Sequence, residues 1–71
     1  MQNQYFSIQV NGEPFYCSEQ MSIEEILIYL NISIELNLVE YNQEIIPNDQ
    51  LSDIFVKKND KLEIITIVGG G

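Results

Sequence analysis

The sequence has no histidine, arginine, alanine or tryptophan, and its 71 residues include a single cysteine, Cys17. Histidine is the most frequent general base and metal ligand, so its absence argues against most acid–base and metal-dependent catalysis. Cys17 also lacks a histidine that could activate it as a nucleophile, and we expect a small buried core residue there. A lone cysteine argues against a disulfide-stabilised secreted domain and favours a reducing compartment.

Basic residues are scarce: three lysines stand against eleven acidic residues, which gives a formal net charge of −8. Phosphate groups bind to basic faces, so this balance argues against nucleic acid and against a membrane surface as partners. It favours docking onto a basic protein. No apolar run reaches transmembrane length, and we expect no signal peptide. We therefore expect a cytoplasmic protein, or one of the plastid stroma if an organelle genome encodes it, since the isoleucine- and asparagine-rich composition is typical of AT-rich coding sequences.

The first half of the chain predicts a hairpin followed by a helix. Residues 5–10 alternate apolar and polar side chains, as a half-buried strand does. Asn11-Gly12 is a strong signal for a tight hairpin turn. Residues 13–17 form the returning strand, which we expect at a sheet edge because the proline within it cannot donate to a neighbour. Residues 22–30 begin with the spacing of a capping box and continue with apolar residues on one helix face.

The second half predicts three further strands, at residues 36–41, 44–46 and 62–68. A loop or a single helical turn is expected at residues 48–53, and a tight turn at residues 58–61. Because the last segment is almost entirely apolar and β-branched, it is expected in the middle of the sheet, beside the first strand.

These elements predict an α+β fold, a mixed sheet of four to five strands with one main helix packed on one face. With the last strand beside the first, the order is that of the ubiquitin-like β-grasp fold. We expect one such domain at residues 1–68 and a flexible glycine tail at residues 69–71.

The glycine run Gly69-Gly70-Gly71 has no role in that fold. Residues without a Cβ atom can pass through a narrow channel, and the carbonyl group of Gly71 would be open to attack on both sides. A carboxylate is a poor electrophile, so another protein would first have to activate it, for example as an acyl-adenylate. Taken alone, three glycines fit a plain flexible linker equally well.

Five parts of the chain carry a resemblance to a known family: residues 8–13, the helix after Ser22, residues 39–47, residues 59–64 and the terminal Gly-Gly. From Ser7 to Gly71 the order of these motifs resembles the ThiS family, the sulfur carriers of thiamine biosynthesis. One departure is Asn59, where the family usually has glycine, but asparagine also tolerates the left-handed conformation. A third terminal glycine is another departure, and it leaves the terminal pair intact.

The resemblance implies a mechanism in which the protein is a carrier without catalytic residues, metal or bound cofactor. An E1-like enzyme of the ThiF type adenylates the terminal glycine, here Gly71, with ATP and magnesium. Sulfur that a cysteine desulfurase takes from cysteine converts it to a thiocarboxylate, which donates the sulfur to a thiazole synthase of the ThiG type. Gly70 and Gly69 would lie in the partner's channel, Gly69 without a separate role.

A docking surface is expected besides the tail, because ordering each tail residue costs roughly 1–2 kcal/mol of backbone entropy. If Leu62 faces the helix, Ile65 and Ile67 lie on the open face of the sheet, with Glu63 and Glu40 at the rim. Exposed aliphatic side chains there would form a partner-docking patch. A register shifted by one residue would bury them in the core instead.

Three other functions fit the same fold. One is the small subunit of molybdopterin synthase, which shares the tail and its activation. Another is a ubiquitin-like modifier that is joined to lysine side chains through an isopeptide bond. The third is a β-grasp interaction module whose tail is inert.

Overall fold

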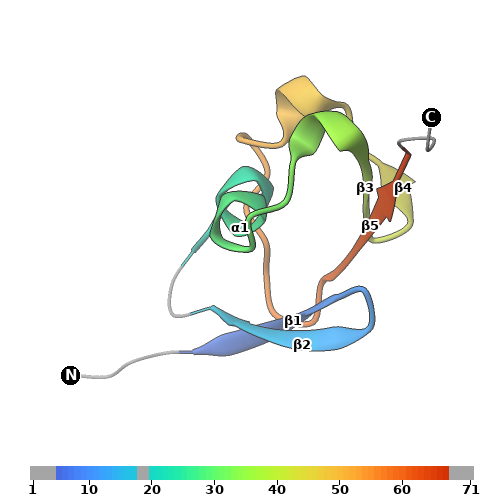
Figure 1. Ribbon diagram of the computed structural model, residues 1–71. Helices are drawn as coiled ribbons and strands as arrows, with labels where there is room; N and C mark the ends of the chain where they lie inside the picture. The colour runs from blue at the N-terminus through green and yellow to red at the C-terminus, as the bar shows by residue number, and fades with distance from the viewer. Residues whose placement is uncertain (1–4, 18–19, 68–71) are drawn as a thin grey trace.

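A five-stranded mixed sheet with one α-helix across one face makes up the protein (Figure 1). The computed structural model describes residues 5–17 and 20–67. The strands are β1 (Phe6–Val10), β2 (Glu13–Cys17), β3 (Asn37–Tyr41), β4 (Glu44–Ile45) and β5 (Lys61–Thr66); the helix is α1 (Ile23–Tyr29), and two short 3-10 helices are η1 (Ile34–Leu36) and η2 (Asn48–Gln50).

The strand order is β2-β1-β5-β3-β4, so the last strand of the sequence is the central one. It runs parallel to β1 and antiparallel to β3. The strand that contains Pro14 lies at one edge, where a missing N–H donor does not interrupt a ladder. This arrangement confirms the predicted β-grasp topology.

The helix α1 is fixed at its start by the capping box that the sequence predicts. The Ser22 hydroxyl accepts the backbone N–H of Glu25 at 3.1 Å, and the Glu25 carboxylate accepts the backbone N–H of Ser22 at 2.9 Å. The helix ends at Tyr29, and Asn31 follows with a φ of 62°, a left-handed conformation that asparagine tolerates.

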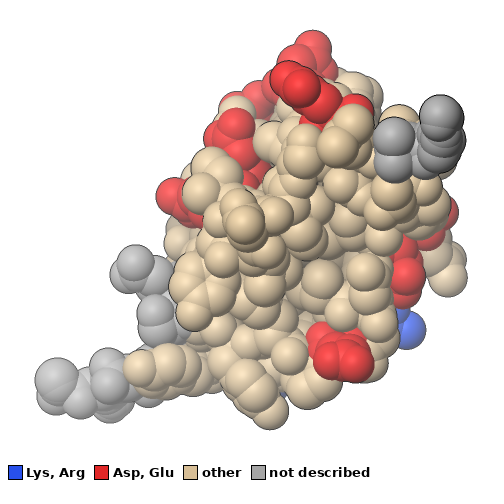
Figure 2. All heavy atoms as spheres, viewed as in Figure 1, with Lys and Arg blue, Asp and Glu red and all other residues tan. Residues whose placement is uncertain are grey.

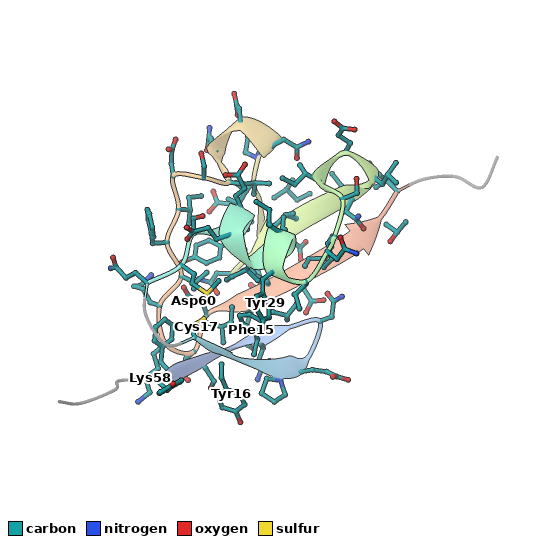
Figure 3. All side chains as sticks on the ribbon, turned by 60° about the vertical axis from the view of Figure 1, so that its left-hand side comes forward. Phe15, Tyr16, Cys17, Tyr29, Lys58 and Asp60 are labelled. Carbon is teal, nitrogen blue, oxygen red and sulfur yellow. The ribbon has the colours of Figure 1, made fainter. Side chains whose placement is uncertain are left out.

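The core lies between α1 and the inner face of the sheet. Cys17 is buried within it, as the sequence predicts. Beside it, the rings of Phe15 and Tyr29 meet edge to face at 5.6 Å between centroids, and Tyr16 points away from the helix (Figure 3). The buried apolar side chains are Ile8, Cys17, Ile23, Ile26, Leu27, Val39, Ile46, Leu51, Val56 and Leu62.

Several boundaries differ from the prediction by one or two residues, among them the start of β3 and the end of β5. The strand expected from Leu36 begins at Asn37, because η1 occupies the three residues before it. The chain leaves α1 with the N–H of Ile32 bonded to the carbonyl of Leu27, so it must turn before it can join the sheet. The strand expected up to residue 68 ends at Thr66, and residue 68 lies outside the described part of the chain.

None of the helices in the described ranges is both long enough and apolar enough to cross a membrane.

Candidate functional site

The central strand β5 leads toward the glycine run, and its last residues are braced by η1. The backbone N–H of Ile67 donates to the carbonyl of Leu36 at 2.9 Å. The Thr66 hydroxyl donates to Asn37 Oδ1 at 2.9 Å, and the Asn37 amide donates to the carbonyl of Ser33 at 2.7 Å. Gly69, Gly70 and Gly71, the predicted site of chemistry, lie outside the described residues.

The outer face of the sheet, opposite α1, carries an exposed apolar patch. Leu38 on β3 is the register partner of Ile65 on β5, and Ile67 follows on the same face. The register is the one assumed from the sequence, because Leu62 is fully buried and Ile65 lies outside. We call the following four side chains the outer apolar patch; their exposed fractions are 38% for Leu38, 56% for Ile45, 46% for Ile65 and 50% for Ile67.

Sequence reasoning missed two members of this patch, Leu38 and Ile45. Both follow from the rule that side chains alternate along a strand, once the pairing of the strands is known. Glu40 is the register partner of Ile45 on one side and of Glu63 on the other, so all three share the outer face. The sequence does not reveal the pairing of Glu40 with Glu63, because β3 and β5 are distant along the chain and must first be aligned.

The two predicted rim residues, Glu40 and Glu63, face each other directly across β3 and β5. Together with Gln43, Lys61 and Ile65 they line a hollow on the outer face. Glu40 is half-buried and Glu63 is exposed. Among the residues that the structure describes, the only salt bridge joins Lys57 and Asp60, so neither carboxylate has an ion-pair partner there.

A second polar cluster surrounds Asp60, at the turn that precedes β5. Its carboxylate, 6% exposed, accepts the Tyr41 hydroxyl at 2.6 Å, the backbone N–H of Lys57 at 2.6 Å and the Asn42 amide at 3.2 Å. Burial alone would raise the pKa of the Asp60 carboxyl, but these hydrogen bonds outweigh it and hold the pKa below its usual value. The cluster fixes the start of β5 against β3, and we assign it a structural role.

Two observations on the described residues bear on metal binding and on nucleophilic chemistry. The described residues contain no group of three histidine, cysteine, aspartate or glutamate residues that could hold a metal ion. Burial raises the pKa of the Cys17 thiol, which disfavours the thiolate and hence nucleophilic attack.

Charge is distributed unevenly over the molecule. All three lysines fall within residues 57–61, at the end of β5 opposite to the one that leads to the glycine run. Acidic side chains occupy several other regions of the visible surface in Figure 2, whereas basic atoms show at only one place. Among the described residues, the basic side chains are therefore gathered at one end of β5.

Comparisons with known proteins identify one family. The family model described as ThiS family matches residues 8–71. The crystal structure of the thiamine biosynthesis protein (ThiS) from Geobacter metallireducens superimposes with a TM-score of 0.80 at 29% identity, covering 93% of this chain and 100% of that one.

Two relatives in sequence extend these findings. A protein named ycf40 from Porphyra purpurea is 45% identical over 71 residues, which are 100% of both chains. A thiazole synthase from Paramagnetospirillum magneticum is 37% identical over 62 residues, which make up 87% of this chain and 19% of that protein. The family match from residue 8 to residue 71, together with the structural likeness, shows that this chain belongs to the ThiS family, small sulfur carrier proteins of thiamine biosynthesis that are not themselves catalysts.

Proposed function

We propose that this protein carries sulfur as a thiocarboxylate on Gly71 and delivers it to a thiazole synthase. The observation that supports the proposal most strongly is the course of β5, a central strand that carries part of an exposed apolar patch and is braced near its end through Ile67 and Asn37. In the sequence, the glycine run follows this strand end. A strand end held in this way would fix the point at which the tail begins, relative to a partner docked on the sheet.

The proposed chemistry takes place on partner proteins. On an E1-like enzyme of the ThiF type, with ATP and magnesium, a carboxylate oxygen of Gly71 attacks the α-phosphate and pyrophosphate leaves. A persulfide sulfur supplied by a cysteine desulfurase then attacks the carbonyl carbon and AMP leaves. A thiol cleaves the resulting sulfur–sulfur bond and leaves the thiocarboxylate. Gly70 and Gly69, which have no side chains, fit a narrow channel to the active site.

The outer apolar patch is the proposed docking surface. Single exposed aliphatic side chains are common on proteins, but Leu38, Ile65 and Ile67 lie together on one face of the sheet. Covering them would make a favourable contribution of about 25 cal/mol for each Å² of apolar surface removed from water, before the costs of association are subtracted. This contribution would offset the entropy that is lost when the tail is ordered in the channel.

A thiazole synthase is the proposed acceptor, because in one relative a segment similar to this chain forms part of a protein that is named thiazole synthase. We propose the plastid stroma as the compartment. Algal relatives such as the one from Porphyra purpurea support that choice, and so does an amino-acid composition that is typical of AT-rich coding sequences.

Mass spectrometry of the intact protein tests the proposal. The protein is incubated with a ThiF-type enzyme, ATP, magnesium, cysteine and a cysteine desulfurase. Replacement of one terminal oxygen by sulfur, followed by loss of that sulfur to a thiazole synthase, is the expected result. Transfer only to a molybdopterin synthase large subunit would assign the protein to the other pathway, and adducts on target lysines would make it a modifier. An unchanged mass with an active ThiF-type enzyme would refute all three.

A further inference from the structure

The outer face of the sheet holds two carboxylates directly opposite each other. Glu40 and Glu63 are register partners in an antiparallel pair, a position in which Cβ atoms are about 5 Å apart and like charges destabilise the sheet. No salt bridge within the described ranges involves either of them. The protein by itself therefore contains a repulsion that a cation between the two side chains would relieve.

The surroundings of this pair are apolar on two sides, beside Glu40 on β4 and beyond Glu63 along β5. Ile45 is the neighbour of Glu40 across β4, and Ile65 follows Glu63 on the same face of β5. Ile65 also lines the hollow that the two carboxylates share. A partner that covers the outer apolar patch must remove water from both carboxylates, and buried carboxylates without a cation are costly. A purely apolar partner surface is therefore a poor match for this face.

On the basis of the proposed function, we infer that the thiazole synthase places an arginine side chain between Glu40 and Glu63 when it covers the outer apolar patch. A guanidinium group has five donors in a planar fork, so it can bond to two carboxylates at once. It is also more weakly hydrated than an ammonium group, which suits a site that becomes buried. Arginine is enriched at the centres of protein interfaces, where lysine is depleted.

Lys61 is the only basic residue that lines the hollow, and it forms no salt bridge among the described residues. In the free protein its ammonium group partly offsets the charge of the two carboxylates without a fixed contact. An incoming guanidinium group has to replace the Lys61 ammonium group as the cation nearest to the two carboxylates. Removing the charge of Lys61 should therefore strengthen the complex by more than removing the charge of Lys58, which is exposed and does not line the hollow.

The test measures the dissociation constant of the full-length protein with purified thiazole synthase, by calorimetry at low and at high salt. Glu40→Gln and Glu63→Gln should each weaken binding about tenfold or more and reduce its salt dependence. Lys61→Gln should strengthen it. Glu13→Gln, which removes the same charge from an exposed position in β2, is the matched control and should change little. The melting temperature of both glutamine variants at the pair should rise, because the repulsion is gone.

Equal affinities for Glu63→Gln and Glu13→Gln would overturn the inference, and so would weaker binding only to the ThiF-type enzyme, which would make that enzyme the occupant. A scan of arginine-to-glutamate variants of the thiazole synthase against Glu63→Arg should give one pair that restores affinity; absence of any such pair would also count against the inference. If the native protein gains the thiocarboxylate but does not bind thiazole synthase, this inference fails and the carrier function stands. If it gains no thiocarboxylate, the carrier function fails whatever the binding result.

Discussion

Asn11 Oδ1 accepts the backbone N–H of Ile64 at 2.7 Å, across 53 residues of sequence. The backbone N–H of Asn11 donates to the carbonyl of Leu62 at 2.8 Å, just after β1 ends at Val10. The side chain of Asn11 thus adds one step to the parallel pairing of β1 with β5. Its φ of 52° is left-handed, so the same residue also closes the hairpin to β2.

Replacing Asn11 separates its two roles. Asn11→Gly keeps the left-handed backbone but removes the acceptor, and we expect the free energy of unfolding to fall by about 1 kcal/mol. Asn11→Asp keeps an acceptor oxygen and should lose less. Urea unfolding gives the two free energies, and hydrogen exchange at the Ile64 amide reports the bond directly. Equal losses for the two variants, with unchanged exchange at Ile64, would show that the bond contributes nothing.

Asp60 should make stability depend on pH in the acid range. Its pKa is lowered in the folded protein, so its contribution is fully present above the unfolded value of about 3.9 and is lost as the pH falls through the folded value. Asp60→Asn should therefore cost about 1–3 kcal/mol at neutral pH and much less near about pH 2. Urea unfolding at both pH values measures this difference.

Asp53→Asn is the control for Asp60→Asn, because Asp53 is exposed and its side chain makes no hydrogen bond or ion pair within the described residues. The free energy of unfolding of the Asp53→Asn variant should equal that of the native protein at both pH values. A constant difference between Asp60→Asn and the native protein at every pH would mean that packing, and not the charge of Asp60, stabilises the turn before β5.

Much of the fold can be predicted from the sequence, because local signals and tertiary packing agree. Asn11-Gly12 forms a tight turn, the Ser22–Glu25 spacing forms a capping box, and the strand that contains Pro14 lies at an edge. The 3-10 helix at Ile34–Leu36 could not be predicted, since no side chain caps it. Its position follows from the path between α1 and β3, which depends on the assembled sheet.

The outer apolar patch provides a prediction that separates docking from folding. Ile65→Glu puts a charge on an exposed position and removes one cross-strand contact with Leu38, so stability should fall by only about 0.2–1 kcal/mol. Affinity for thiazole synthase should fall about tenfold or more, because an apolar contact is replaced by a third carboxylate. Leu62→Glu buries a charge in the core and should prevent folding. Circular dichroism and calorimetry distinguish these outcomes; an unfolded Ile65→Glu variant would contradict the assigned face.

The candidate site could be predicted only in part, for a physical reason. Alternation along the last strand was enough to place Ile65 and Ile67 on the face opposite to Leu62, because the period of a strand is fixed. Which of the two faces packs against the helix had to be assumed. Leu38 was missed, and Glu40 could be assigned only to a rim, because their positions opposite β5 depend on register between distant strands. Ile45 was missed as well, although only a short turn separates β4 from β3. That Glu40 and Glu63 lie opposite each other is likewise a property of the assembled sheet.

The glycine run should be dispensable for folding and necessary for function. Deleting Gly70 and Gly71 removes the proposed site of adenylation, and the free energy of unfolding should stay within about 0.5 kcal/mol because no core side chain is lost. Formation of the acyl-adenylate, measured as pyrophosphate release with a ThiF-type enzyme, should be abolished. Deleting Gly69 alone keeps the terminal pair and should preserve much of the activity, since no separate role is assigned to Gly69. If the shorter chain without Gly70 and Gly71 still released pyrophosphate, or no longer folded, the tail would not be the reactive group that we propose.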